Sequence, residues 1–158
     1  MHPNAALIQQ FYQAFQQLDA ATMAGCYHPD IHFSDPVFPD LRGTEASDMW
    51  RMLVSRAQDF SLTFGDISAD ASHGEASWVA TYTFSATGRT VVNKIQARFE
   101  FRDGKIIRHV DSFDLWRWAH QALGLKGLLL GWTPLVRNAI RQQAAKGLAQ
   151  YRARKSAA

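Results

Sequence analysis

Three side chains that can take up and release protons lie close together in the segment HVDSFDLW: His109, Asp111 and Asp114. The residues around them are typical of a buried strand that runs into a helix. Burying a carboxylate or an imidazole costs several kcal/mol unless hydrogen bonds or an opposite charge compensate it. Titratable groups in such surroundings are candidates for acid/base catalysis.

The alternation of side chains along a strand separates these three residues. His109 and Asp111 share a face with Ile107 and Phe113, and we expect this face to point into the core. Asp114 lies one step beyond and suits the N-cap of a helix that begins LWRWAHQAL. His109 is then either a core histidine with satisfied hydrogen bonds or the partner that orients Asp111.

Another carboxylate on an apolar strand face is Asp35, in the segment DIHFSDPVF. It shares this face with Ile31 and Phe33. Pro36 and Pro39 end the strand, since neither can donate a backbone hydrogen bond. Two interpretations stay open: Asp35 enters a pocket as a second carboxylate, or it accepts backbone hydrogen bonds in the turn that follows.

Apolar residues at three- and four-residue spacing predict the helices. We expect helices at residues 3–18, 20–27, 43–59 and 115–123, and a long helix from Pro134 that is capped by Thr133. In the helix at 43–59, Thr44 is the expected N-cap. The long helix has one apolar side, formed by Val136, Ile140, Ala144, Leu148 and Tyr151.

Four runs rich in Val, Ile, Thr, Phe and Trp predict strands at residues 60–70, 75–86, 90–102 and 105–113. Asp103-Gly104 is typical of a type I′ hairpin turn, which needs positive φ at both central residues. Consecutive hairpins give an antiparallel meander. Helices followed by a curved antiparallel sheet predict an α+β fold with the helices packed on one face.

Composition favours one compact domain. The chain has 158 residues, of which 47% are hydrophobic and 12% aromatic. Its single cysteine, Cys26, cannot form an internal disulfide, and the opening segment lacks the apolar region of a signal peptide. The longest apolar stretch falls far short of the ~20 residues that a spanning helix needs. We therefore expect a cytoplasmic protein.

Charge is distributed unevenly along the chain. Residues 115–158 contain eight basic residues and no acidic residue, although the net charge of the whole chain is only +3. We favour a helix that docks across the domain or at a dimer seam over peripheral membrane contact by the basic tail. Without a nucleic-acid-binding motif, we predict no nucleic-acid partner.

The order of helices, YHPDIHFSDP, meander and DGKIIRHVDSFDLWRW resembles the superfamily named after nuclear transport factor 2, in particular its SnoaL-like and ketosteroid-isomerase-like branch. The resemblance covers about residues 5–123. It predicts a SnoaL-like domain at residues 1–123 and a basic helical extension at 124–158. It further implies a cone-shaped fold with an apolar pocket, no cofactor and a homodimer.

Two branches of this superfamily point to the same kind of site residue. In ketosteroid isomerases an aspartate before proline is the general base, which corresponds to Asp35. The oxyanion-hole tyrosine of those enzymes corresponds to Phe11, with Tyr12 one step away, and their second acid falls near Ala97. In limonene-epoxide hydrolases and SnoaL cyclases an aspartate in a pattern like W-x-D-x-F-D corresponds to Asp111.

The hydrolases differ from this chain elsewhere. Their further arginine and aspartate fall near Trp78 and Ala80, which are apolar here. We therefore hypothesise that Asp111, oriented or charged by His109, is the principal acid/base group and that Asp35 is the second. The substrate would be a small, largely apolar molecule such as an enolisable ketone, a polyketide or an epoxide. The expected pocket residues are Phe15, Phe33, Trp50, Trp78, Asn93, Phe99 and Phe113.

Other chemistries lack a signal in the sequence. His28 and His32 have helical metal-site spacing, but Pro29 between them breaks the helix, and there is no HExxH, CxxC or Gly-rich phosphate loop. We therefore expect neither a metal nor a cofactor. Two alternatives to an enzyme stay open: a non-catalytic member that binds a hydrophobic ligand or a protein, and an interaction module that uses the basic tail.

Overall fold

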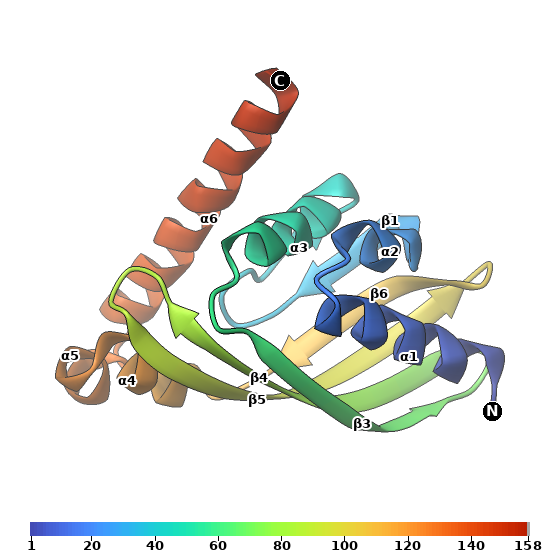
Figure 1. Cartoon of the computed structure of the whole chain (residues 1–158), viewed down its shortest axis with the longest axis horizontal. Helices are drawn as coiled ribbons and strands as arrows, with labels where there is room; N and C mark the ends of the chain where they lie inside the picture. Colours follow the sequence, from blue (N-terminus) through green and yellow to red (C-terminus); the bar gives the residue numbers. More distant parts are fainter. Residues whose placement is uncertain (158) are drawn as a thin grey trace.

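A curved six-stranded sheet forms the body of the protein, and helices cover its concave face (Figure 1). The computed structural model describes residues 1–157. The helices are α1 (Pro3–Gln16), α2 (Ala20–Gly25), α3 (Thr44–Arg56), α4 (Leu115–Leu123), α5 (Leu125–Leu130) and α6 (Pro134–Ala157). The strands are β1 (Tyr27–Ser34), β2 (Leu41–Arg42), β3 (Ser61–Ala69), β4 (His73–Phe84), β5 (Arg89–Arg102) and β6 (Lys105–Ser112). The predicted α+β class is confirmed.

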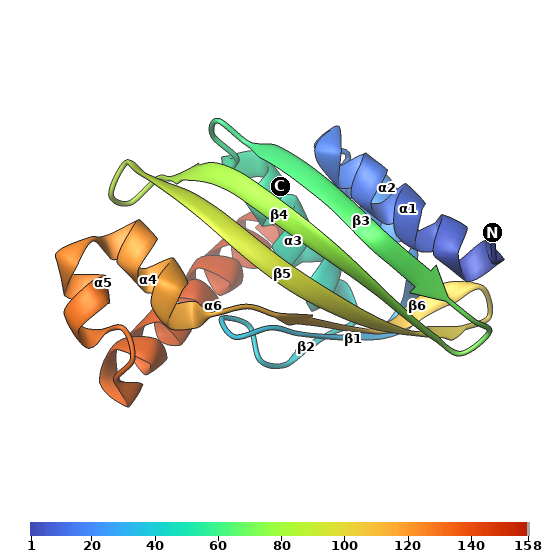
Figure 2. The ribbon, with the colours of Figure 1, turned by 90° about the horizontal axis from the view of Figure 1, so that it is seen from below.

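The strand order β2-β1-β6-β5-β4-β3 combines the predicted meander with a pairing that the sequence did not indicate. Strands β3 to β6 are antiparallel neighbours, and both Asp103 and Gly104 have positive φ, as the hairpin turn requires. Strand β1, however, pairs in parallel with β6. Seen from below, the long strands curve across the molecule with α1 to α3 behind them (Figure 2).

Two local predictions are wrong, each for a backbone reason. The N-cap of α3 is Gly43, with φ of 58°, and Thr44 is the first helical residue. A bulge in β6 places Ile106 and Arg108 opposite consecutive residues of β5, so Ile107 is an extra residue. Ile106 is therefore fully buried and Ile107 only half-buried, the reverse of the prediction.

Beyond the bulge the predicted faces hold. His109 lies opposite Phe99, and Asp111 lies opposite Ala97 on β5. All four side chains are buried. Asp114 is the N-cap of α4, as predicted, because its carboxylate accepts the amide hydrogen of Arg117 at 3.0 Å.

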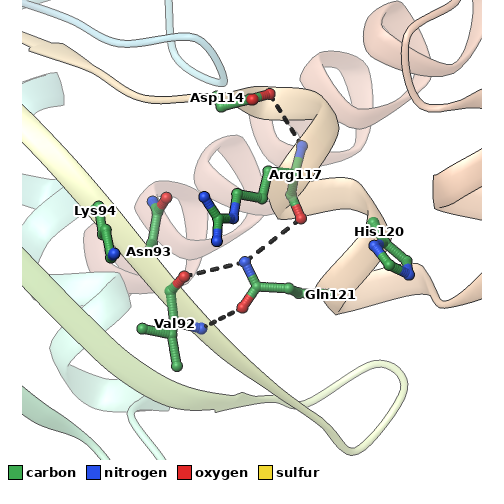
Figure 3. Close-up of a pocket in the computed structure, with 7 residues that line it drawn as sticks. All are labelled: Val92, Asn93, Lys94, Asp114, Arg117, His120 and Gln121. Carbon is green, nitrogen blue, oxygen red and sulfur yellow. Dashed lines mark hydrogen bonds between the residues drawn. The ribbon is translucent and has the colours of Figure 1, made fainter.

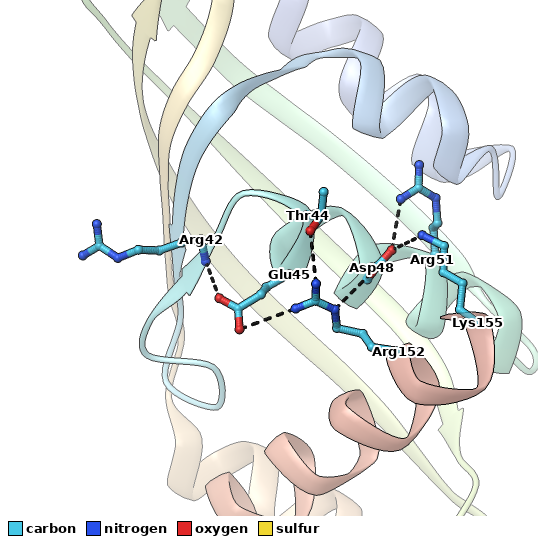
Figure 4. Close-up of polar contacts among 7 residues, drawn as sticks. All are labelled: Arg42, Thr44, Glu45, Asp48, Arg51, Arg152 and Lys155. Atoms are coloured by element: carbon cyan, nitrogen blue, oxygen red, sulfur yellow. Dashed lines mark hydrogen bonds and ion pairs between the residues drawn. The ribbon is translucent and has the colours of Figure 1, made fainter. Parts of the chain in front are cut away.

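Helix α6 docks through its predicted apolar side, where Leu148 is buried and Ala144 and Tyr151 pack against the core. Polar bonds to α3 reinforce this contact (Figure 4). The buried Asp48 carboxylate accepts bonds from Lys155 Nζ at 2.6 Å and Arg51 Nη1 at 3.2 Å, and Arg152 Nε lies 3.2 Å away. The division into units at residues 1–123 and 124–158 stays a prediction.

We predict that Asp48→Ala lowers the free energy of unfolding by about 2 kcal/mol, between the values typical of exposed and buried ion pairs. Burial alone would raise the pKa of Asp48, but the bonds from Lys155 and Arg51 and the charge of Arg152 hold it below its ordinary value of 3.8. The stabilisation is therefore present above that pH and is lost as the pH falls through the lowered pKa.

Chemical denaturation at neutral pH measures this difference, and hydrogen exchange tests whether α6 loosens. The control is Asp40→Ala, which removes an exposed partner of Arg42. Equal losses in the two variants would show that the contact between α3 and α6 does not depend on Asp48.

Candidate active site

A chain of hydrogen bonds runs through the core from α3 to β6. Trp50 Nε1 donates to the Tyr27 hydroxyl at 2.8 Å, and that hydroxyl lies 2.8 Å from His109 Nδ1. His109 Nε2 lies 2.8 Å from Asp111 Oδ1. Since an indole N–H can only donate, the chain is satisfied when Tyr27 donates to Nδ1 and Nε2–H donates to an ionised Asp111.

His109 is fully buried among aromatic rings. Ring centroids of Phe99, Phe33 and Phe11 lie 4.5, 5.0 and 5.5 Å from that of the imidazole, and Trp50 stacks on it at 6.1 Å. Such apolar surroundings strengthen the hydrogen bonds that are made and penalise any that are missing. The imidazole is therefore held in one orientation, with one nitrogen directed at Asp111.

Two hydrogen-bond donors in the aromatic core are buried without a partner within residues 1–157: the Tyr12 hydroxyl and Trp78 Nε1. Their ring centroids are 5.7 Å apart. Burial, and then the charge of Asp111, raise the pKa of Tyr12 well above its ordinary value, so this hydroxyl keeps its proton. Neither donor is used by a hydrogen bond within the described part of the chain.

Asp35 caps the turn after β1 and is also electrostatically coupled to Asp111. Its Oδ1 accepts the amide hydrogens of Val37 at 2.7 Å and Phe38 at 2.6 Å. Burial raises the pKa of Asp35 to about 7, and the charge of Asp111 adds to this increase against the lowering effect of the backbone bonds. The hydrogen bonds in the turn therefore confirm that Asp35 accepts backbone hydrogen bonds. The raised pKa of Asp35 also suits a group that exchanges protons near neutral pH.

Most of the predicted pocket residues gather around this hydrogen-bond chain. Phe15, Phe33, Trp50, Trp78 and Phe99 belong to one buried cluster, against which Phe113 packs. Asn93 lies elsewhere, four residues along β5 from Ala97. It lines a hollow of about 350 Å³ between β5 and α4, together with Val92, Lys94, Asp114, Arg117, His120 and Gln121 (Figure 3).

Comparison with known proteins places this geometry in a family. The model of the SnoaL-like domain matches residues 8–109. The chain belongs to the SnoaL-like domain family. A search of curated proteins gave no significant match.

Solved structures share the fold of this SnoaL-like chain at low sequence identity. An epoxide hydrolase of the limonene-epoxide-hydrolase-like type from M. tuberculosis is 21% identical, with a TM-score of 0.65 over 82% of this chain and 96% of that chain. A putative polyketide cyclase from Xanthomonas campestris is 23% identical, with a TM-score of 0.64 over 76% and 96%. TsrD from Streptomyces laurentii is 24% identical, with a TM-score of 0.66 over 78% and 96%.

Sequence reasoning assigned no role to two residues of the candidate site. Tyr27 carries no motif, and only the parallel pairing of β1 with β6 brings its hydroxyl to His109. Tyr12 is one position away from the family's tyrosine position, at Phe11, yet both residues are fully buried. The wide, continuous apolar side of α1 was the available signal, because it leaves room for two inward neighbours.

Within residues 1–157, no group of three or more His, Cys, Asp or Glu side chains could hold a metal ion. In the same part of the chain, none of the helices combines the length and the apolar character needed to cross a membrane.

We predict that Asp35→Asn stabilises the protein relative to the wild type at alkaline pH. Because burial raises the pKa of Asp35 to about 7, the folded state keeps a proton that the unfolded state loses near 3.8. The free energy of unfolding of the wild type therefore decreases as the pH rises from 3.8 to about 7. The decrease is at most about 4 kcal/mol, at ~1.4 kcal/mol per pKa unit. Asparagine keeps the Oδ1 acceptor and removes this dependence.

Denaturation of the two proteins at acid and alkaline pH measures the effect. Carboxyl carbon NMR reports the pKa of Asp35 directly, and this pKa should fall in Asp111→Asn because a neighbouring negative charge is removed. Titration of Asp35 near its ordinary value in the wild type would contradict the prediction.

We also predict that Tyr12→Phe raises the free energy of unfolding by about 1 kcal/mol, because it removes a buried hydroxyl that has no partner. Tyr27→Phe is the matched control: it removes a bonded hydroxyl and leaves Trp50 Nε1 and His109 Nδ1 unpaired, so it should destabilise the protein. Equal effects of the two variants on thermal unfolding would argue against this distinction.

Proposed function

We propose that this SnoaL-like protein is a cofactor-free acid/base enzyme of the isomerase, cyclase or epoxide-hydrolase type. Its substrate is a small, largely apolar molecule that carries an oxygen atom. The observation that carries the proposal is the buried contact of 2.8 Å between His109 Nε2 and Asp111 Oδ1. A buried carboxylate that is held in one orientation by a hydrogen bond is suited to act as a general base.

In the proposed reaction, Asp111 takes a proton from a carbon next to the substrate carbonyl. The electron pair of the broken C–H bond moves into an enolate, and negative charge develops on the carbonyl oxygen. Tyr12 and Trp78, whose donors have no partner within residues 1–157, supply hydrogen bonds to this oxygen. Asp35, with a pKa of about 7, donates a proton when the enolate collapses.

Among the structural neighbours, proteins described as putative polyketide cyclases and as an epoxide hydrolase support this substrate class. A neighbour named TerC was co-crystallised with polyporic acid, which is consistent with a small-molecule ligand. The homodimer and the cytoplasmic location remain expectations.

The alternative is a SnoaL-like protein that binds a hydrophobic ligand or a protein partner without catalysis. One observation favours it: Asp35 Oδ1 is occupied by two backbone amides. The His109–Asp111 pair would then only orient the ligand.

We expect the wild-type protein to catalyse exchange of the α-protons of 2-tetralone in D2O, measured by NMR, with hydrolysis of styrene oxide as a second probe. Asp111→Asn should lower kcat/KM by about 10²–10⁴, the range for loss of a general base. Asp114→Asn is the control, because Asp114 is an exposed N-cap. Binding of 2-tetralone without exchange above the buffer rate, unchanged in Asp111→Asn, would favour the alternative.

The pH profile tests the role of Asp35. If Asp35 acts as the acid, the rate should fall above about pH 7, as its carboxyl loses its proton. Asp35→Asn should be slower at neutral pH and lack this alkaline decline. A wild-type rate that stays constant between about pH 6 and about pH 9 would show that a group other than Asp35 donates the proton.

A further inference from the structure

Large apolar side chains are exposed together at the end of the molecule formed by α4, α5 and the start of α6. Seven of the eleven exposed large apolar residues within positions 1–157 lie between residues 116 and 135. We call this surface the apolar end: Trp116, Leu125, Leu128, Leu129, Leu130, Trp132 and Leu135. It lies at the opposite end of the molecule from the N-terminus (Figures 1 and 2).

The packing of α5 on α4 forces these side chains outward. Gly127 faces α4 so closely that an added Cβ would clash with the backbone of Ala119, and a Cβ at Gly131 would lie 2.8 Å from Ala119 Cβ. Since glycines occupy the contact, the leucines of α5 point to solvent. Leu129 is 59% exposed and Trp132 is 62% exposed.

The two tryptophans of the apolar end are fixed by bonds within it. Trp116 Nε1 donates to the Leu128 carbonyl at 2.9 Å, and Trp132 Nε1 donates to the Leu129 carbonyl at 3.0 Å. The indole N–H groups therefore need no external partner, and the rings present their apolar surface. A cluster of exposed large apolar side chains is typical of an interaction site.

Positive charge surrounds the apolar end. Arg117 and Lys126 are exposed, and the described residues form no ion pair with either. Arg89 adds a further charge, because its guanidinium bonds the Gln121 carbonyl beside Gly124. By contrast, Arg152 and Lys155 at the far end of α6 are engaged by Asp48. Unpaired positive charge therefore lies next to the apolar end, whereas two of the basic residues at the end of α6 are paired with Asp48.

We propose that the apolar end docks onto an anionic lipid bilayer. Exposed leucine and tryptophan side chains bordered by lysine and arginine are the composition that inserts into the interface between headgroups and acyl chains. Arginine and lysine then face the anionic headgroups. This contact is independent of the proposed acid/base chemistry, and it uses α4, α5 and only the first residues of α6.

Cosedimentation of the full chain with vesicles tests the proposal, with tryptophan fluorescence as a second readout. We expect binding to phosphatidylcholine vesicles that contain about one third phosphatidylglycerol, a blue shift of the emission, and weak binding to phosphatidylcholine alone. The double variant Leu129→Gln, Trp132→Gln should lose binding more than about tenfold. Leu53→Gln, on α3 and 39% exposed, is the matched control.

A charge variant keeps the test independent of folding. Lys126→Gln should weaken binding about fivefold at low salt, corresponding to one lysine near an anionic surface. Arg154→Gln, exposed at the end of α6, should have little effect. No binding of the wild type, or equal binding of the double variant and Leu53→Gln, would overturn the proposal. Dimers that the double variant abolishes, without vesicle binding, would instead assign the apolar end to a second copy of the chain.

Discussion

The compensation of a buried imidazole and carboxylate is the constraint on which the rest of the site depends. Neither His109 nor Asp111 could stay in an aromatic core without partners, and the partners come from distant segments. Tyr27 begins β1, and Trp50 lies in α3. The parallel pairing of β1 with β6 and the packing of α3 on the concave face are therefore required to bring these partners to His109 and Asp111.

The bulge in β6 shows how narrowly this arrangement is determined. One residue of slippage in a strand exchanges its two faces. Without an extra residue at Ile107, the alternation that places Ile106 against Phe101 would turn His109 and Asp111 away from the core. With it, both the apolar start of the strand and its polar end face inward. The hairpin turn at Asp103-Gly104 fixes the register in which β6 begins to pair with β5.

The sequence predicted the elements with local signals and missed those set by distant contacts. The alternation of side chains along the strand predicted that Asp111 points inward. The position of Asp114 just after the strand predicted that it caps the next helix. Both predictions depend only on residues that are close in sequence. Gly43 replaced Thr44 as the cap because the chain enters α3 with positive φ, which a propensity rule does not reveal. Tyr27 was missed since parallel pairing leaves no pattern in one strand. The turn bonds of Asp35 were foreseen, whereas its coupling to Asp111 depends on tertiary distance.

Three tyrosine–tryptophan pairs in the protein differ in whether their hydrogen-bond donors have a partner. Trp50 donates to Tyr27, and Trp118 donates to Tyr82, each at 2.8 Å. Tyr12 and Trp78 are also neighbours, but neither donor has a partner within residues 1–157. The donors of the first two pairs are therefore satisfied within the protein, and phenylalanine would fill position 12 at lower cost. In the proposed reaction, these two unpaired donors are the groups that would bind the oxygen atom of a substrate.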